Sequence, residues 1–331
     1  MYIYVAGRGH SGSTILDIML GGGSAIESVG ELGTIGTRGL SGDKTGHLCG
    51  CGAVIAECPF WTRVREAVEA RCGPASFPTL MREVYDLSDV RWFPRALLPA
   101  SPGSPLRRMV RTLAAVEEAV KAVTGKPHLL DSNKEPTRAL LLLRYHPGSR
   151  VIHLVRDPRG IVASHYWRVR GEVGFVILRR RFHPGRATMP LFLMLAAGAW
   201  TVGNLCAELA RRTAPDRTMR LRYEDLRDHP AEAIRRIGRT FGVQLDDVAD
   251  RIERHEPFPV GHNVGGNHIR REGAVRFDPG AEKARRPLPR WVRLMTVALC
   301  WPLMRRYGYT THTHGPGDLA PPAAARLQEG G

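Results

Sequence analysis

The sequence predicts an α/β fold, a P-loop-type parallel β-sheet flanked by helices on both faces. Short apolar segments alternate with longer amphipathic ones, a glycine-rich turn follows the first apolar segment, and polar motifs follow the later ones. Ligands of such sheets bind beyond the carboxyl ends of the strands, so the polar motifs should meet at one edge. The expected strands are residues 2–6, 128–131, 151–155 and 219–222.

The segments between these strands have helical spacing, most clearly in residues 106–124, where apolar side chains recur along one face. Residues 25–46 and 74–105 are loop-like, the second because it is rich in proline. We expect one domain over residues 1–310, with insertions at about 72–125 and 170–200, and a disordered tail at 311–331. The other expected helices are residues 15–20, 63–71, 136–145, 159–170, 191–212, 230–241 and 289–307.

The charge balance is strongly basic, +16 over 331 residues, yet only five of the 48 basic residues are lysines. Acidic residues are interspersed, so the arginines favour a pocket for a small, multiply anionic ligand over a nucleic-acid surface. Residues 190–200 and 292–304 are the most apolar later segments, and both are too short to span a bilayer, which takes roughly 20 residues. We interpret both as buried helices and expect a cytoplasmic protein without a membrane span, since no signal peptide precedes the first strand.

Three of the six cysteines, Cys49, Cys51 and Cys58, lie within residues 47–61. Their spacing is C-x-C-x6-C, without the paired C-x-x-C units of common zinc sites. We therefore predict a reduced structural loop and no metal, with zinc as the alternative.

Residues 7–14, Gly-Arg-Gly-His-Ser-Gly-Ser-Thr, follow the first strand and open a helix. Such a turn points backbone N–H groups at an anion, and the helix adds its positive end. A nucleoside triphosphatase would carry lysine where Ser13 stands, so triphosphate hydrolysis is disfavoured. The alternative is a plain glycine-rich turn. The expected phosphate-binding residues are Arg8, Gly9, His10, Ser11, Gly12, Ser13 and Thr14.

Arginines and one lysine mark the ends of the later segments. Arg156 ends the third strand, where it can fork onto a phosphate, and Ser164 and Arg168 share one face of the following helix. A surface pair of Arg156 with Asp157 is the alternative. Lys134 follows the second strand in Leu-Asp-Ser-Asn-Lys-Glu-Pro, and a solvated lysine at a helix start is its alternative.

In combination these motifs resemble those of the sulfotransferases that use 3′-phosphoadenosine-5′-phosphosulfate (PAPS), in a bacterial form closer to the tyrosylprotein and carbohydrate branch than to the cytosolic branch. The resemblance implies that residues 7–14 bind the 5′-phosphosulfate, with His10 where the family has lysine or arginine. It also implies that Arg156, Ser164 and Arg168 bind the 3′-phosphate, joined by Arg270 or Arg271 from a basic loop, while Tyr223 flanks the adenine.

The resemblance further implies catalytic roles for Lys134, Glu31 and His10. Lys134 lies in an Asn-Lys-[DE]-Pro stretch, whose lysine contacts the sulfuryl group. Glu31 follows Gly30 and lies 17 residues after Thr14, where related enzymes carry the base, and Glu27 is a neighbouring decoy. His128 is interpreted as structural, and Arg8 or Lys134 is the alternative to His10 at the bridging oxygen.

The implied reaction is transfer of a sulfuryl group to a hydroxyl or amine by in-line displacement, with no metal. The acceptor is a small molecule, a glycan or a peptide, its pocket shaped by residues 72–125 and 170–200, and the protein is a monomer or homodimer. The alternatives are a P-loop kinase-like nucleotide phosphotransferase and a non-catalytic module that binds nucleotides or polyanions.

Overall fold

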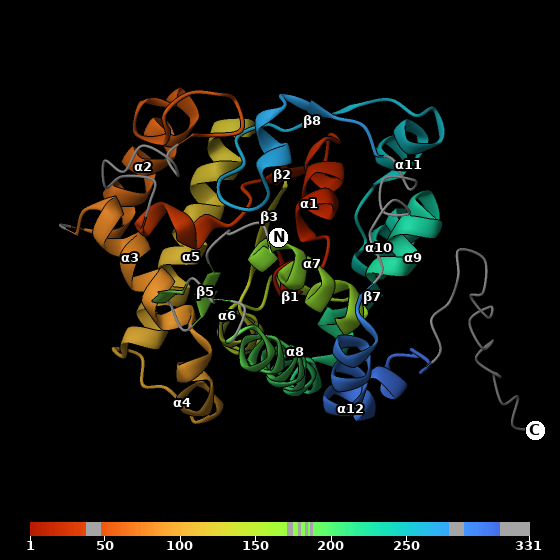
Figure 1. Ribbon diagram of the computed structural model, residues 1–331. Helices are drawn as coiled ribbons and strands as arrows, with labels where there is room; N and C mark the ends of the chain where they lie inside the picture. The colour runs from red at the N-terminus through yellow and green to blue at the C-terminus, as the bar shows by residue number, and fades with distance from the viewer. Residues whose placement is uncertain are drawn as a thin grey trace, which may run out of the picture.

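A five-stranded parallel sheet forms the centre of the protein, seen in a computed structural model (Figure 1). The structure describes residues 1–37, 48–73, 75–170, 175–177, 180–182, 185, 188–277 and 288–311, with the backbone alone for 168–170, 175–177 and 180–182. The strand order is β2-β3-β1-β4-β7, which confirms the predicted α/β class. The strands are β1 (Tyr2–Gly7), β2 (Ile26–Ser28), β3 (His128–Lys134), β4 (Ser149–Val155) and β7 (Thr218–Arg222).

Strand β1 shows why these segments are apolar without interruption. Tyr2 and Tyr4 pack into a core on one face of the sheet, whereas Ile3 and Val5 pack into a second core on the other face. Alternate side chains of a strand point to opposite faces, so a strand covered on both sides is apolar at every position.

Helices cover both faces, as predicted, and Figure 1 shows the two groups on opposite sides of the sheet. The first group consists of α2 (Pro59–Cys72), α3 (Phe77–Ser88), α4 (Phe93–Leu97), α5 (Pro105–Thr124) and α6 (Pro136–Tyr145). The second consists of α1 (Ser13–Gly21), α9 (Tyr223–Asp228), α10 (Pro230–Phe241) and α11 (Asp246–Glu253). A third apolar cluster joins α7 (Pro158–Arg170), α8 (Met189–Arg212) and α12 (Arg290–Arg306).

Two predicted loops contain regular structure. Residues 26–28 form the edge strand β2, which is too short for an alternation pattern to reveal. Residues 74–105 contain α3 and α4, because their prolines lie at the first positions of helices, where no backbone N–H is needed. Two hairpins add β5 (Phe175–Ile177) with β6 (Arg180–Phe182), and β8 (Phe258–Pro259) with β9 (Ala274–Val275). Of the expected tail, residues 312–331 lie outside the described part of the chain.

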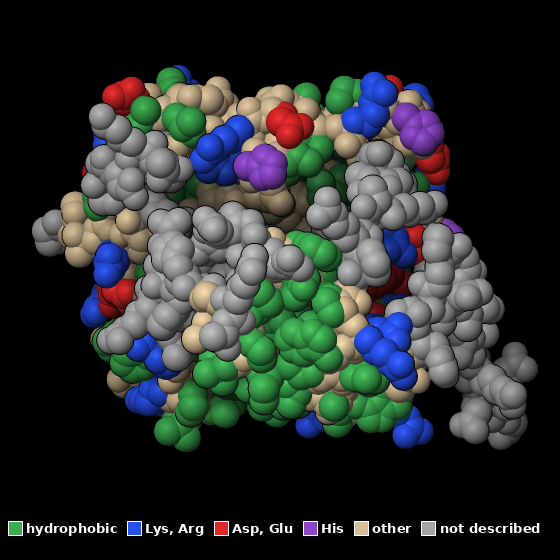
Figure 2. Space-filling view, in the orientation of Figure 1, with side chains coloured by type: hydrophobic (Ala, Val, Ile, Leu, Met, Phe, Trp, Pro, Cys, Tyr) green, Lys and Arg blue, Asp and Glu red, His purple; other side chains and the backbone are tan. Residues whose placement is uncertain are grey.

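Helix α8 is buried on one face only, which corrects the prediction of a buried helix there. Trp200 and Asn204 are buried where α8 packs against α6, α7 and α12. Figure 2 shows hydrophobic side chains gathered over the outer face of α8 and beside α12. Within the described residues, α8 is the one helix long and apolar enough to cross a membrane. The large apolar side chains that α8 exposes are Leu191, Met194, Leu195, Val202, Leu205 and Leu209.

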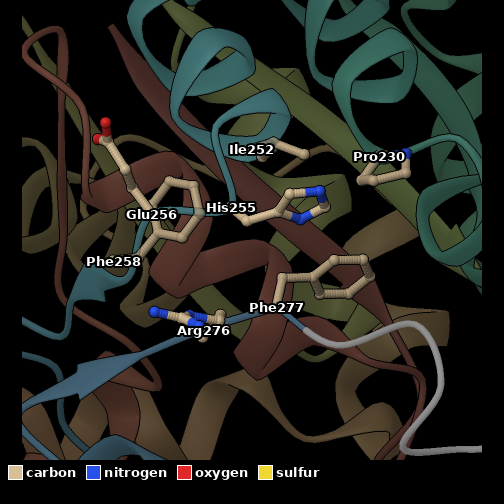
Figure 3. A pocket seen from close by; sticks show the side chains of 7 residues that line it. All are labelled: Pro230, Ile252, His255, Glu256, Phe258, Arg276 and Phe277. Atoms are coloured by element: carbon tan, nitrogen blue, oxygen red, sulfur yellow. The ribbon is translucent and has the colours of Figure 1, made fainter.

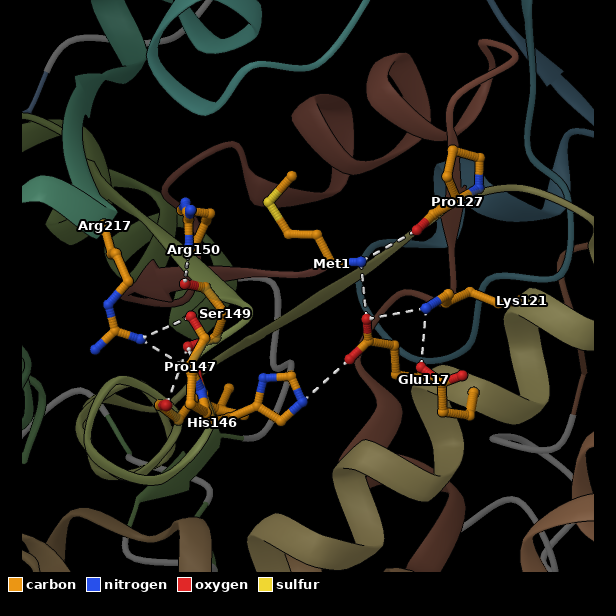
Figure 4. Close-up of polar contacts among 11 residues, drawn as sticks. Met1, Glu117, Lys121, Pro127, His146, Pro147, Ser149, Arg150 and Arg217 are labelled. Carbon is orange, nitrogen blue, oxygen red and sulfur yellow. Dashed lines mark hydrogen bonds and ion pairs between the residues drawn. The ribbon is translucent and has the colours of Figure 1, made fainter.

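A cluster of polar contacts lies at the amino edge of the sheet, where the strands begin (Figure 4). Glu117 of α5 lies 2.8 Å from the amino group of Met1 and 3.1 Å from Nε2 of His146. Burial would raise the pKa of Glu117, but hydrogen bonds from His146 and the amino group outweigh it and hold that pKa below its ordinary value. Met1 and His146 precede β1 and β4, so this cluster lies at the sheet edge opposite the predicted motifs.

Candidate active site

The predicted motifs meet at the carboxyl edge of the sheet. In the strand register Ala6 lies opposite Lys134, and Gly7 lies opposite Leu154. Val155, which precedes Arg156, lies opposite Arg222, which precedes Tyr223. Four strand ends therefore bring residues that are far apart in the sequence to one place, as expected for ligand sites of parallel sheets.

The loop of residues 7–14 has the curled backbone that the glycines predict. His10 and Gly12 both have positive φ, 67° and 88°. A Cβ at Gly12 would lie 2.2 Å from the ring of Tyr223, so both the conformation and the close approach require glycine. Ser13 and Thr14 begin α1, whose positive end faces the loop. The loop is therefore built like a site for an anion.

Ser11 supplies a hydrogen-bonding group inside this loop. Its side chain is 1% exposed, and its Oγ atom has no hydrogen-bond partner among the described residues. An unpartnered buried hydroxyl costs free energy, on the order of 1–3 kcal/mol, unless a ligand or water satisfies it. Ser11 thus fits a phosphate oxygen as a partner.

Arg156 connects the loop to the end of β4. Arg156 is 5% exposed, and its guanidinium donates to the carbonyl oxygen of His10 at 2.7 Å and stacks 4.3 Å from the centre of the Tyr223 ring. Asp157 pairs with Arg159 at 2.6 Å, so the Asp157 carboxylate is occupied and Arg156 is no surface residue. The geometry brings Arg156, Tyr223 and Gly12 into one contact group.

Beneath this group lies the buried carboxyl of Glu224. It accepts from the backbone N–H of Asp157 at 3.0 Å and from the hydroxyl of Tyr309 at 2.7 Å. Burial raises the pKa of Glu224. Glu224 thus connects the start of α9 to the turn after Arg156 and to the buried Tyr309.

Helix α7 carries Ser164 and Arg168, the two other residues that the resemblance assigns to the 3′-phosphate. The hydroxyl of Ser164 donates to the carbonyl oxygen of Gly160 one turn earlier, at 3.1 Å. The side chain of Arg168 lies outside the described residues.

Lys134 and Glu31 form an ion pair at the ends of β3 and β2. Nζ of Lys134 donates to a carboxylate oxygen of Glu31, and also to the carbonyl oxygen of Ser132 at 3.3 Å. The Lys134 side chain is 14% exposed and that of Glu31 23%. Lys134 has φ of 74°, a conformation that costs a non-glycine residue on the order of 1–3 kcal/mol and that clusters at functional sites.

Glu27 and His128, the residues that the sequence left as alternatives or as structural, do not face Lys134. Glu27 is 8% exposed and pairs with Lys126 at 3.0 Å. His128 begins β3, six residues before Lys134, so it lies about 20 Å away at the opposite edge. These positions leave Glu31 as the glutamate of this segment that faces Lys134.

The basic loop of residues 260–271 covers Glu31 and the start of α1. The N–H of Glu31 donates to the carbonyl oxygen of Val264 at 2.7 Å, and the N–H of Asn267 donates to Oγ1 of Thr14 at 3.3 Å. A Cβ at Gly30 would lie 2.3 Å from the Val264 oxygen, so glycine is required before the glutamate. The Gly-Glu pair is thus explained by backbone packing.

Within this loop the two arginines differ in environment. Arg270 is 4% exposed and donates to the carbonyl oxygens of Leu48 at 2.5 Å and Asn263 at 3.4 Å. Burial and the nearby charge of Arg271 lower the pKa of Arg270. Arg271 is exposed. Arg270 therefore holds the loop together, and Arg271 is the more exposed of the two arginines.

Three features of the site were not foreseen in the sequence. The ring of His165 on α7 lies 4.9 Å from that of His10, edge to face. The side chain of Arg8 runs against Gly203 of α8. Asp17 of α1 is buried and accepts from the hydroxyl of Ser28 at 2.6 Å. No local spacing marks these contacts, because each joins separate elements.

A small pocket elsewhere does not compete with this site (Figure 3). It lies between the end of α11 and the β8–β9 hairpin, with His255 and Phe277 among its lining residues. None of the residues predicted for the anion or for catalysis lines it.

Comparisons with known proteins agree with the geometry. The model of the sulfotransferase family matches residues 80–247, which is 168 of the 331 residues, from α3 into α11. A search of curated proteins gave no match. The sulfotransferase domain from the curacin biosynthetic pathway is a structural neighbour with a TM-score of 0.51 and 17% identity, covering 93% of this chain and 97% of that one.

A second neighbour is the sulfotransferase STF9 from Mycobacterium avium, with a TM-score of 0.50 and 15% identity over 93% of this chain and 77% of that chain. At such identities the likeness establishes the fold, and the family match carries the assignment further. The chain therefore belongs to the sulfotransferase family, which makes it a transferase of sulfuryl groups.

Proposed function

We propose that this enzyme transfers a sulfuryl group from PAPS to a hydroxyl or amine of an acceptor by in-line displacement. The observation that carries the proposal is the Lys134–Glu31 pair, a cation and a base in contact beside the residue 7–14 loop. Lys134 can stabilise negative charge on the sulfuryl group and its leaving oxygen. Glu31 can accept the proton of the acceptor.

The proposed site for the sulfuryl donor follows the contact group around Arg156. The amides of the loop, the Ser11 hydroxyl and the start of α1 would hold the 5′-phosphosulfate. Arg156, Ser164 and the exposed Arg271 would hold the 3′-phosphate, and Arg168 remains an expected contributor. Tyr223, already stacked on Arg156, would flank the adenine.

In the proposed step the acceptor oxygen or nitrogen forms a bond to sulfur while the bond from sulfur to the phosphate oxygen breaks. The acceptor proton passes to the Glu31 carboxylate, and the electron pair of the broken bond leaves with adenosine 3′,5′-bisphosphate. As this bond breaks, Lys134 turns from Glu31 toward the leaving oxygen, where a compact point charge neutralises the developing negative charge. Positioning and electrostatics supply most of the acceleration, as in phosphoryl transfer.

His10 is proposed as a second group at the leaving oxygen. Its ring packs against His165, and its carbonyl oxygen is held by Arg156. Arg8 runs along Gly203, which favours Lys134 over Arg8 as the main cation.

We further propose one domain over residues 1–310, a cytoplasmic location, and a monomer or homodimer that binds no nucleic acid. The acceptor is proposed to be a small molecule, a glycan or a peptide.

A ligand-binding experiment and a transfer assay test the proposal. Adenosine 3′,5′-bisphosphate should raise the Tm of the wild type, and the rise should be lost in Arg156→Ala. With labelled PAPS and an acceptor panel, Glu31→Gln and Lys134→Ala should lose turnover while still binding the bisphosphate. Glu27→Gln and Lys126→Ala are matched controls, because they make the same changes in the neighbouring ion pair.

Two results would count against the proposal. A Tm rise with ATP and none with the bisphosphate would indicate a nucleotide phosphotransferase. Full sulfuryl transfer by both Glu31→Gln and Lys134→Ala would remove the proposed catalytic pair.

A further inference from the structure

Four side chains with metal-binding atoms converge at the loop of residues 260–271. They are Cys49, Cys51 and Cys58, from the segment before α2, and His262, from the loop that covers Glu31. Their four ligand atoms lie within 4.8 Å of one another. The sulfurs of Cys51 and Cys58 lie 3.7 Å apart, and those of Cys58 and Cys49 lie 3.8 Å apart. Nδ1 of His262 lies 3.5 Å from the Cys58 sulfur and 3.6 Å from the Cys49 sulfur.

These separations are those of a tetrahedral zinc site. With Zn–S bonds of about 2.3 Å and a Zn–N bond of about 2.0–2.1 Å, tetrahedral geometry places sulfurs about 3.8 Å apart and sulfur and nitrogen about 3.5–3.6 Å apart. Four of the six separations among the ligand atoms agree with these values, and the other two are at most 4.8 Å. A disulfide would hold two sulfurs about 2.0 Å apart, and these cysteines are free.

We propose that Cys49, Cys51, Cys58 and His262 bind one zinc ion as a structural site. Three thiolates and one imidazole make a closed set of four protein ligands, which leaves no position for water or substrate. The ion would therefore stabilise the fold and take no part in the chemistry.

The surroundings hold the ligands in place without the ion. The ring of His262 stacks on Phe60 at 4.4 Å and 5°, and its carbonyl oxygen accepts from Nε1 of Trp61 at 3.2 Å. Cys58 occupies the N-cap position of α2, beside the positive end of that helix. Outer contacts that orient ligands in this way are a regular feature of metal sites.

A tight turn positions the other two cysteines. The N–H of Cys49 donates to the carbonyl oxygen of Ala53 at 2.8 Å, and the N–H of Gly52 donates back to Cys49 at 3.0 Å. Gly52 has φ of 89°, which this turn needs and which glycine adopts without strain.

The proposed ion would fasten the loop that carries Val264. The N–H of Gly50 donates to the carbonyl oxygen of Asn263 at 2.9 Å, and Val264, the next residue, accepts from Glu31. A zinc ion at His262 would thus fix the segment that supports the proposed base. The prediction of no metal rested on cysteine spacing, which contained no sign of a ligand 204 residues after Cys58.

The test is metal content, measured on the full chain after incubation with zinc and removal of free ion. Elemental analysis should find about one zinc per chain in the wild type. Cys51→Ser, at the exposed ligand, and His262→Asn should each lose most of it. Cys72→Ser makes the same change outside the cluster and should keep it. Cobalt in place of zinc should show the visible bands of a tetrahedral thiolate site, lost in the same two variants.

Less than a tenth of an equivalent of zinc in the folded wild type, with no cobalt bands, would overturn the proposal. A Cys51–Cys58 disulfide found by mass spectrometry in protein purified under reducing conditions would do the same. Cys58 is buried, so its variants can fail to fold, and the exposed Cys51 keeps the test decisive. Metal content requires no turnover, so this outcome is independent of the proposed sulfuryl transfer.

Discussion

The guanidinium of Arg156 donates to the carbonyl oxygen of His10 at 2.7 Å, so the end of β4 holds the loop that follows β1. The same group stacks on Tyr223, which follows β7. One buried arginine therefore connects three strand ends.

This arrangement predicts that Arg156→Lys is not conservative. Lysine keeps the charge but loses the planar fork and the stack on Tyr223. We expect the affinity for adenosine 3′,5′-bisphosphate to fall roughly tenfold to hundredfold, since a charged hydrogen bond contributes about 1.5–3 kcal/mol. Calorimetric titration of each protein with the bisphosphate measures this affinity. Arg159→Lys is the control, because Arg159 pairs with Asp157, and an equal loss there would contradict the prediction.

A pair of glycine variants separates the shape of the loop from its sequence. Gly12→Ala should abolish bisphosphate binding and lower stability by about 1–3 kcal/mol, because the new Cβ would meet the Tyr223 ring at positive φ. Gly9→Ala should be nearly neutral, since a Cβ there meets nothing within 4 Å. Denaturant unfolding and calorimetry measure both effects. Equal behaviour of the two variants would refute the assigned loop geometry.

Lys134→Arg tests the need for a compact charge. Both residues carry the same strain at φ of 74°, so the substitution changes only the shape of the cation. We expect kcat to fall at least tenfold while bisphosphate affinity changes little, because the loss falls on the transition state. The readout is steady-state kinetics together with calorimetry. A variant that raises KM and leaves kcat unchanged would place Lys134 in binding alone.

Asp17 predicts a specific dependence of stability on pH. Burial raises its pKa to about 7, against hydrogen bonds from Ser28 and Ser132 that lower it. In the unfolded chain Asp17 loses its proton near pH 4, so between about pH 4 and 7 the folded state binds the extra proton. The free energy of unfolding from this group should therefore fall by about 1.4 kcal/mol per pH unit as the pH rises through this window.

Comparison of the wild type with Asp17→Asn isolates this contribution. The variant has no group that titrates at this position. The difference in the free energy of unfolding between wild type and variant should therefore change with pH between pH 4 and 7 and stay constant above pH 7. Asp216→Asn, at an exposed aspartate, is the control and should follow the wild type. A constant difference across the window would show that Asp17 is ionised in the folded protein.

Local patterns predicted the sheet well, because strands covered on both faces must be apolar throughout, as β1 is. Local patterns failed where the effect of a residue depends on its position within a helix or strand. The prolines of residues 74–105 suggested irregular chain, yet they begin helices. Three residues of β2 are too few for any pattern to appear.

Some residues of the candidate site were likewise marked by local motifs, and others were not. The strand-end motifs marked Arg156, Lys134 and the residue 7–14 loop, since a β–loop–α sequence determines where those residues emerge. The difference in burial between Arg270 and Arg271 is revealed only by the folded chain. The convergence of His262 on the cysteines likewise depends on tertiary packing, to which sequence spacing is blind.

Val264 accepts from the N–H of Glu31 and donates to the carbonyl oxygen of Val29. The backbone of the proposed base is thus held by a residue synthesised more than two hundred positions later. A ribosome-bound chain that has completed β7 possesses all five strands but lacks this brace. The backbone contacts that hold Glu31 can therefore form only after residue 264 has been synthesised, later than the five strands of the central sheet.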